Sequence, residues 1–357
     1  MPGTRLEKVR NALAGLGADA LLVTEPINQS WLCGFDYTDG YLLVCAENAY
    51  VITDSRYTEA ARAACPRDFA VLDMASEKVS AMISRLLAEN GAATLVFEDR
   101  VMSCADYRRL ETAVNAAFAP AGTLLEDLRE YKDESELAAI RRAQELTDLA
   151  FTHILKVLTP NMTENDVAIE LEFFLRKNGA SGKSFDFITV SGEATSLPHG
   201  TPQNRVLQKG FLTMDFGCVY QGYCSDMTRT VCLGRADAEM KKLYGTVLAA
   251  QRAALSVIRD GMLCTEVDAA ARTLIDRDYP GAFGHGLGHG VGRFIHEAPR
   301  LSPRAGDKRL APGHVVTVEP GIYLEGKYGV RIEDMVFITP GGAEAITASE
   351  KELIELF

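Results

Sequence analysis

Apolar positions in the first third of the chain switch between a spacing typical of helices and one typical of strands. Apolar and charged residues interleave at helical spacing as far as Gly17, and the short β-rich runs DALLVTE, YLLVCA and YVITD follow. Further along, SRYTEAARAA and SEKVSAMISRLLAEN are typical of helices, whereas FAVLDM and ATLVFED are typical of strands. We therefore predict an α/β domain over residues 1–127.

A charged segment, LREYKDESEL, starts at residue 128 and opens a long helical pattern. A domain boundary placed just before it leaves a second domain over residues 128–357. This second part contains an internal repeat, because TENDVA at 163–168 is echoed by TEVDAA at 265–270. Each copy is predicted to begin an amphipathic helix with a capping threonine and an acidic residue three positions later.

Two predicted β-hairpins complete the repeat. The segment GFLTMDFGCVYQGYCSDMTRTV from Gly210 is echoed by GHVVTVEPGIYLEGKYGVRIEDMVFI from Gly313. Within them TMDFG matches TVEPG, and SDM matches IED, while Tyr220 and Tyr323 occupy matched positions that suggest packing between the copies. A twofold repeat of two helices and a hairpin predicts an α+β domain whose halves pack about a pseudo-twofold axis.

The hairpins place their acidic residues by parity. If Gln221-Gly222 is a two-residue turn, facing residues have numbers with an odd sum, so Asp215 and Asp226 share a face. A three-residue loop at EGK puts Glu319 and Glu333 on one face of the second hairpin in the same way. Apolar neighbours indicate that these acids are buried, where an unpaired carboxylate is costly to keep ionised.

The segment GHGLGHGVG, residues 284–292, has glycine at five of nine positions with His285 and His289 between them. Each interior glycine costs a helix about 1 kcal/mol relative to alanine, so an extended conformation is predicted. Both histidines then lie on one face, and the bare glycine face allows another backbone to approach closely. A glycine-rich loop with two incidental histidines is the alternative.

Four carboxylates and His289 would form an oxygen-rich set of metal ligands. Carboxylates that converge in one cleft repel each other, and two divalent cations balance their charge. This ligand chemistry favours Mn²⁺, with Co²⁺, Fe²⁺ or Zn²⁺ as alternatives. Two such ions can hold a bridging hydroxide and polarise a carbonyl, which is chemistry suited to amide hydrolysis.

Composition and charge exclude several other classes of function. The 357 residues are 47% hydrophobic and 24% charged, as in folded proteins of two domains. A net charge of −12 argues against binding to nucleic acid or to a membrane surface. The eight cysteines form no CxxC pair and follow no signal peptide, so we expect reduced thiols in a cytoplasmic protein, with Cys218, Cys224 and Cys232 as small buried side chains.

The ordered motifs MDFG, SDMTRT, HGLGHGVG, VEPGIY and GVRIED resemble those of the pita-bread metallopeptidases. They are most similar to the aminopeptidase P and prolidase group, and ALLVT and ITDSRYTEAA resemble the creatinase-type amino-terminal domain of that group. The resemblance implies a homodimeric peptidase that cleaves the bond preceding proline through a metal-bridging hydroxide. It leaves open whether the substrates are Xaa-Pro dipeptides or longer peptides.

The resemblance also implies which residues bind the metal ions. The ligands would be Asp215, Asp226, His289, Glu319 and Glu333. Asp226 and Glu333 would bridge both ions, Asp215 would bind one, and His289 and Glu319 would bind the other. Glu319 would also be the general base.

Three histidines resemble residues that contact the substrate in this family, namely His199, His285 and His296. His285 has the alternative role of orienting a ligand. Arg331 lies two residues before Glu333 and therefore on its face of the strand. There it would either neutralise the ligand cluster or bind a substrate carboxylate.

Two other functions stay open at this point. A non-catalytic pita-bread homologue would bind a partner and would be expected to have lost ligands, whereas all five are present. A metal-free hydrolase like creatinase would use the same scaffold without calling for five ligands.

Overall fold

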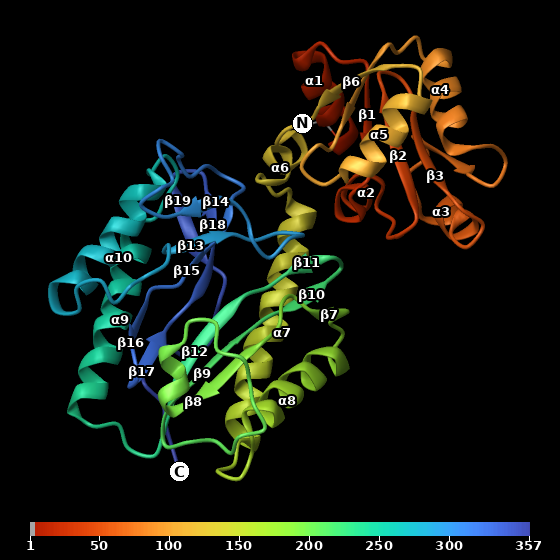
Figure 1. Cartoon of the computed structure of the whole chain (residues 1–357). Coiled ribbons are helices and arrows are strands. Elements are labelled where there is room, and N and C mark those ends of the chain that lie inside the picture. The colour runs from red at the N-terminus through yellow and green to blue at the C-terminus, as the bar shows by residue number, and fades with distance from the viewer. Residues whose placement is uncertain (1–3) are drawn as a thin grey trace. The chain divides into compact units, whose positions relative to one another are not determined.

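Apolar side chains gather in separate cores on either side of Leu128, so the chain divides into two units, Met1–Leu128 and Arg129–Phe357 (Figure 1). The structure, a computed structural model, describes residues 4–357. Within that range, no helix combines the length and the apolar character that a membrane span requires. We call the two parts the amino-terminal and the carboxy-terminal unit.

The amino-terminal unit is built on a six-stranded mixed sheet with the strand order β4-β3-β2-β1-β5-β6. The pairs β1–β2 and β2–β3 are antiparallel, and the other neighbours are parallel. Its strands are β1 (Ala20–Val23), β2 (Gly40–Cys45), β3 (Ala49–Thr53), β4 (Phe69–Asp73), β5 (Thr94–Phe97) and β6 (Ala117–Pro120). Its helices are α1 (Arg5–Leu16), α2 (Pro26–Cys33), α3 (Thr58–Ala64), α4 (Val79–Glu89), α5 (Cys104–Ala113) and α6 (Leu124–Arg129). The α/β character predicted for this part is confirmed.

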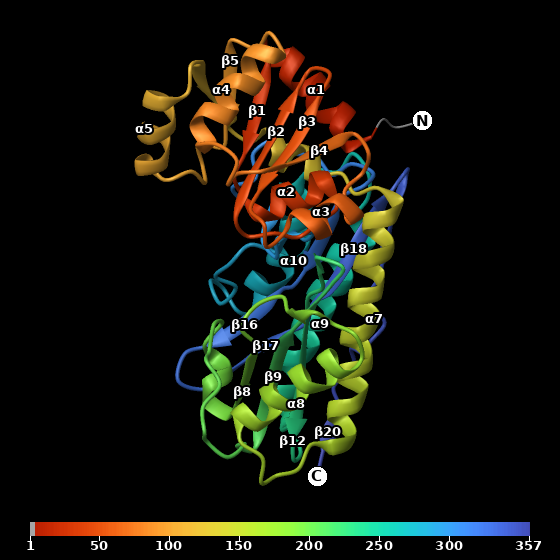
Figure 2. The same ribbon diagram turned by 90° about the vertical axis from the view of Figure 1, so that its right-hand side faces the viewer.

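Helices cover both faces of this sheet (Figure 2). The core on one face includes Val9 and Leu13 of α1, and the core on the other includes Ile83 and Leu86 of α4. Helices α2 and α5 are not predicted by the apolar pattern. Nearly every residue of α2 is buried, whereas Leu110 is the one buried residue of α5, so neither helix shows an amphipathic stripe.

The carboxy-terminal unit contains four long helices and a set of short sheets. The helices are α7 (Glu134–Val157), α8 (Glu164–Lys177), α9 (Ala238–Val257) and α10 (Cys264–Asp278). The strands of the first half are β7 (Gly182–Lys183), β8 (Ile188–Ser191), β9 (Gly210–Phe216), β10 (Cys218–Tyr220), β11 (Tyr223–Cys224) and β12 (Met227–Leu233). Those of the second half are β13 (Gly288–Gly290), β14 (Glu297–Leu301), β15 (Val315–Val318), β16 (Gly321–Leu324), β17 (Tyr328–Arg331), β18 (Asp334–Thr339), β19 (Gly342–Ala345) and β20 (Glu355–Leu356).

Each half of this unit packs two helices against its own strands. One core joins α7 and α8 to β9 and β12, and another joins α9 and α10 to β15, β16 and β18. Figure 1 shows these helix pairs on the two sides of the strands, and Figure 2 shows α7 running alongside them. The strands β9 and β12 pair antiparallel, as do β15 and β18. The predicted α+β domain with an internal repeat therefore forms.

Both predicted hairpin turns are confirmed. Gln221 and Gly222 have φ values of 49° and 78°, the positive angles of a two-residue type I′ turn, and Tyr220 pairs with Tyr223. In the second hairpin Leu324 pairs with Tyr328, which leaves a three-residue loop. Both loops thus have the lengths that put each pair of acids on one face.

The predicted cap at Thr265 is wrong, because the repeat has another register in its helices. Helix α8 begins after the cap Thr163, but α10 begins after Leu263, so Thr265 lies inside the helix. The buried positions Val167 and Val267 lie a hundred residues apart, as do the helix starts. Burial of the apolar stripe therefore sets where α10 begins, and the TE letters that suggested the alignment are two residues out of register.

This register yields a prediction for two matched substitutions. Thr163 Oγ1 accepts the Asp166 backbone N–H at 3.1 Å, so Thr163→Ala should lower the free energy of unfolding by about 1 kcal/mol. Thr265→Ala should change it by less than about 0.5 kcal/mol, because no cap is lost. Urea unfolding followed by circular dichroism measures both. Equal losses at the two positions would restore Thr265 as a cap.

Candidate metal centre

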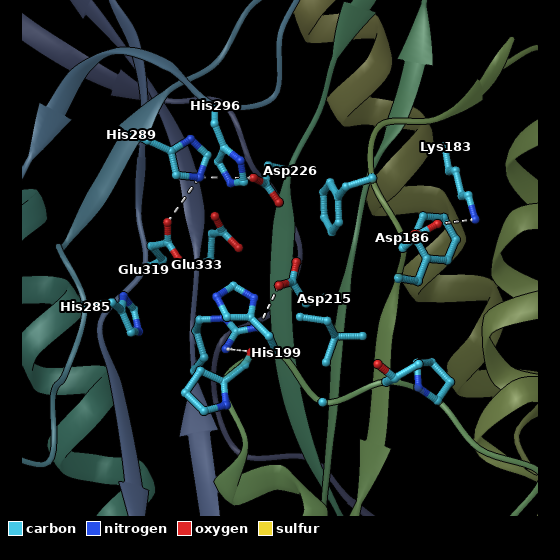
Figure 3. Close-up of a pocket in the computed structure, with 18 of the residues that line it drawn as sticks. Lys183, Asp186, His199, Asp215, Asp226, His285, His289, His296, Glu319 and Glu333 are labelled. Atoms are coloured by element: carbon cyan, nitrogen blue, oxygen red, sulfur yellow. Dashed lines mark hydrogen bonds and ion pairs between the residues drawn. The ribbon is translucent and has the colours of Figure 1, made fainter.

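A cavity of about 910 Å³ opens in the carboxy-terminal unit between its two halves. All the metal ligands and substrate-side residues expected from the sequence line it: His199, Asp215, Asp226, His285, His289, His296, Glu319, Arg331 and Glu333. Figure 3 shows the side chains of Asp226, His289, Glu319 and Glu333 pointing toward one another. The first hairpin supplies Asp215 and Asp226, and the second supplies Glu319 and Glu333.

The tightest group in this cavity consists of Asp226, His289 and Glu333. One potential ligand atom from each lies within 4.8 Å of the other two, and all three residues are buried. His289 Nε2 is 3.6 Å from Asp226 Oδ2 and 3.2 Å from Glu319 Oε1. Three of the four expected carboxylate ligands therefore meet at the imidazole of His289.

Asp215, the fifth expected ligand, is held from one side by Arg331. Its Oδ2 accepts a hydrogen bond from a terminal nitrogen of Arg331 at 2.6 Å, while its Oδ1 is buried without a hydrogen-bond partner. The guanidinium is also buried, with only 5% of its side chain exposed. This geometry favours the first of the two roles considered for Arg331, neutralisation of the acidic cluster.

Burial and mutual repulsion raise the pKa values of these acids. The pKa of Asp226 lies well above its usual range because the residue is buried and faces the charges of Glu333 and Asp215. The pKa of Glu333 is raised by burial and by Glu319, and burial raises that of Asp215 in spite of Arg331. Burial also opposes ionisation of Glu319, but without metal a hydrogen bond from a protonated His289 Nε2 and the nearby positive charges lower its pKa to about 2.

The ring of His289 is oriented by its own backbone and by its neighbours. Its Nδ1 lies 3.1 Å from the Gly290 carbonyl, which can accept the Nδ1 proton and leave Nε2 free to coordinate. A Cβ at position 288 would collide with the Thr317 carbonyl, and one at 290 with the Ala298 carbonyl. The predicted close approach of another backbone to the glycine face is thus confirmed, and it comes from β14 and β15 of the same half.

Two of the expected substrate histidines, His285 and His296, differ in what their rings contact. His285 uses both ring nitrogens, because Nδ1 lies 2.8 Å from the Gly286 carbonyl and Nε2 lies 3.0 Å from the Tyr323 hydroxyl. This favours an orienting role over direct contact with substrate. His296 is exposed at the cavity and packs edge-on against His289 at 4.5 Å; partial desolvation and the neighbouring His289 lower its pKa to about 4, so it is neutral near pH 7.

Three residues of the cavity or its support were not predicted from the sequence. Thr228 donates to Glu333 Oε2 at 2.7 Å and accepts from Arg331 Nε at 3.0 Å. Tyr323, expected to serve packing between the halves, instead hydrogen-bonds Arg331 at 2.7 Å as well as His285. The alternation of side chains along a strand could have predicted Thr228, because it lies two residues after Asp226 and therefore on the same face.

Arg300 is the third unpredicted residue. It pairs directly with His289 across β13 and β14, so its side chain emerges on the same sheet face and lines the cavity. In the described part of the chain its guanidinium makes neither a hydrogen bond nor an ion pair, and the residue is exposed. It therefore differs from the buried Arg331.

The cavity has the chemistry of a divalent cation site. Three buried carboxylates and the half-buried Glu319 face one imidazole nitrogen, and Arg331 is the only fully buried cation among the described residues that line the cavity. Asp215 has an orphaned oxygen, and three of the acids retain protons more strongly than usual. A bound cation would give the orphaned Asp215 oxygen a partner and would favour the ionised form of the acids, so these residues fit bound metal.

Comparison with known proteins agrees with this chemistry. Residues 138–340 match the model of metallopeptidase family M24, and residues 5–131 match the creatinase/prolidase amino-terminal domain. The chain belongs to metallopeptidase family M24. As a member of this family it is a metal-dependent peptidase, and the predicted family and enzyme class are confirmed.

Solved structures and other members of the M24 family match the chain over nearly its full length. An uncharacterized peptidase, YqhT, from Bacillus subtilis is 39% identical over 99% of this chain and 100% of its own. An Xaa-Pro dipeptidase structure from Bacillus anthracis has a TM-score of 0.95 and 40% identity, covering 98% and 99%. An X-Pro aminopeptidase structure from Thermotoga maritima has a TM-score of 0.90 and 34% identity, covering 95% and 98%. These neighbours confirm the expected fold of both domains.

The crowded acids of this M24 site make a prediction about the metal-free protein. Glu333 binds its proton more tightly in the folded than in the unfolded chain, so stability should fall as pH rises above about 4.3. Glu333→Gln should therefore raise the thermal midpoint in chelator at pH 7 by a few degrees, since about 1 kcal/mol shifts it by about 2–4 °C. Thermal unfolding at pH 5, 6 and 7 measures this.

The matched control is Glu325→Gln, which removes the same charge from the exposed tip of the same hairpin. It should leave the pH dependence unchanged. Addition of Mn²⁺ should stabilise the wild type and Glu325→Gln but not Glu333→Gln. A midpoint of Glu333→Gln that is lower than that of the wild type in chelator would show that the four acids do not repel one another.

Proposed function

We propose that the chain is an Xaa-Pro peptidase that hydrolyses the bond preceding proline with two divalent metal ions, most favourably Mn²⁺. The observation that carries this proposal is the meeting of four carboxylates and His289 in one cavity. Asp215, Asp226, His289, Glu319 and Glu333 would hold the ions. Bound there, the ions would supply Lewis acidity for the scissile carbonyl and a lowered pKa for coordinated water.

The chain's own residues suit the proton transfers of amide hydrolysis. Glu319 lines the cavity and is oriented by Thr317 Oγ1, which donates to its Oε1 at 3.0 Å. In this position it would accept the proton of the attacking water and return it to the proline nitrogen as that group leaves. The neutral imidazole of His296 lies beside this centre and can donate a hydrogen bond to the oxygen that gains charge.

Among Xaa-Pro peptides we propose that dipeptides are the preferred substrates. A dipeptide presents a free proline carboxylate one residue beyond the scissile bond, and a fixed cation in the cavity would recognise it. Arg300 lines the cavity on the His289 face and is uncommitted, whereas Arg331 is bound to Asp215. His199, also in the cavity wall, would contact the substrate as well.

We also propose that the protein works in the cytoplasm as a homodimer, with peptides rather than nucleic acid as its ligands. All eight cysteines are free thiols, and Cys218, Cys224 and Cys232 are buried as expected. The net charge of −12 disfavours nucleic acid. The homodimer rests on the family resemblance.

The direct test compares Xaa-Pro dipeptides with Xaa-Pro-Xaa tripeptides after loading with Mn²⁺. We expect hydrolysis of both classes to need metal and kcat/KM to be higher for the dipeptide. Glu319→Gln should lower kcat at least about 100-fold, the scale of a lost general base, with metal content measured in parallel. Inactivity of the metal-loaded wild type toward both peptide classes would refute the proposal.

The role of Arg300 makes a separate prediction. Loss of a charged hydrogen bond costs about 1.5–3 kcal/mol, so Arg300→Met should raise KM for a dipeptide by about 10- to 100-fold. The same substitution should have little effect on the corresponding Xaa-Pro amide, which lacks the carboxylate. Arg304→Met, which removes an exposed arginine outside the cavity wall, is the control. Equal effects on acid and amide would assign the carboxylate to another residue.

A further inference from the structure

A buried ion pair lies directly behind the segment that carries His296. Lys132 Nζ is 2.5 Å from Glu297 Oε1, with only 1% and 6% of the two side chains exposed. Arg129 approaches the other carboxylate oxygen at 3.6 Å and stacks on the ring of Phe294. Neither Lys132 nor Glu297 lines the cavity, so the metal centre does not explain them.

The ion pair and the catalytic cavity lie on opposite sides of one short stretch of chain. Successive residues of an extended segment point to opposite faces. His296 faces the cavity, and Glu297, the first residue of β14, faces the buried interior. A restraint on the Glu297 side chain is therefore a restraint on the backbone that orients the His296 imidazole.

The last glycine of the GHGLGHGVG motif belongs to this ion pair. A Cβ at Gly292 would collide with the Glu297 carboxylate and crowd the Lys132 side chain. Gly292 also accepts the Cys224 backbone N–H at 2.8 Å and donates to the Phe294 carbonyl at 3.1 Å. The turn from His289 to His296 is thus closed around the pair and tied to β11, two residues before Asp226.

Stability alone gives a weak reason for such a pair. Burying two charges costs desolvation free energy, and well-packed apolar residues of similar volume often replace a buried pair without loss of stability. What apolar residues cannot supply is a short, directional, charge-assisted hydrogen bond at a fixed point. Here that point is the residue next to His296.

We propose that Lys132 and Glu297 are positioning residues for His296. They fix the backbone behind the imidazole so that the ring meets the oxygen that gains charge during hydrolysis. This inference rests on the proposed function, because it takes His296 to act in that reaction. It adds to that function two residues, one of them more than 160 positions away in the sequence.

The test is a double-mutant cycle between the pair and His296. The variant Lys132→Met/Glu297→Gln leaves no unpaired charge from these two residues, and Glu297→Gln alone, which keeps an acceptor for Lys132, is the second variant. We expect each to lower kcat for a dipeptide at least tenfold in the wild type, with KM and metal content within twofold. In a His296→Ala background the same changes should lower kcat less than twofold, because the group they position is gone.

Val267→Ala is the control for loss of stability, since it opens a cavity in the core between α9 and α10 away from the site. It should lower the thermal midpoint and leave kcat unchanged at temperatures where it is folded. Equal fractional losses of kcat in the wild-type and His296→Ala backgrounds would overturn the positioning role. So would an unchanged kcat in both pair variants.

A readout without catalysis separates this inference from the proposed function. In metal-free protein labelled with ¹⁵N-histidine, the His296 ring signals are assigned from their loss in His296→Ala. The pair variants should shift or broaden these signals and leave those of His153, on α7, unchanged. An inactive wild type would sink the proposed function alone, whereas unperturbed His296 signals in both pair variants would sink the positioning role.

Discussion

Repulsion among four carboxylates in one buried cavity is the constraint on which the rest of the carboxy-terminal unit depends. A single carboxylate in such a place would take up a proton or find one cationic partner, but four exceed what Arg331 can balance. The remaining charge is balanced either by bound protons or by cations from outside the chain. The same constraint explains why the fifth side chain is His289. Its imidazole can be neutral, whereas a fifth carboxylate would add to the repulsion among the acids.

The internal repeat is the means by which the fold delivers these acids. Each half presents one hairpin, and each hairpin loop has the length that puts two acids on one face. Two threonine hydroxyls support these acids, since Thr228 donates to Glu333 and Thr317 donates to Glu319. The two halves are joined at Thr228, a residue of the first hairpin whose hydroxyl bonds Glu333 of the second. The two halves therefore fix each other at the centre.

Sequence was most informative where a periodic rule and a sharp turn acted together. The positive φ angles demanded at Gln221-Gly222 fix register, and register fixes the faces of Asp215 and Asp226. The sequence was less informative where burial, rather than residue type, determines the position or extent of a helix. The register of α10 follows its buried stripe, and α2 is buried nearly all round, so the letters alone mislead or say nothing. Tyr323 bonds Arg331 of the neighbouring strand and His285, and no local pattern encodes these contacts between side chains.

The two arginines of the cavity show why a shared residue type does not imply a shared role. To turn toward a substrate, Arg331 would have to leave Asp215, whose other oxygen already lacks a partner, and also break its bonds to Thr228 and Tyr323. The free-energy cost of leaving a buried carboxylate unpaired exceeds the free energy gained from a contact that faces solvent. Arg300 has no such commitment and stays exposed. Burial therefore distinguishes the two arginines: Arg331 stabilises the acidic cluster, and Arg300 remains available to an incoming anion.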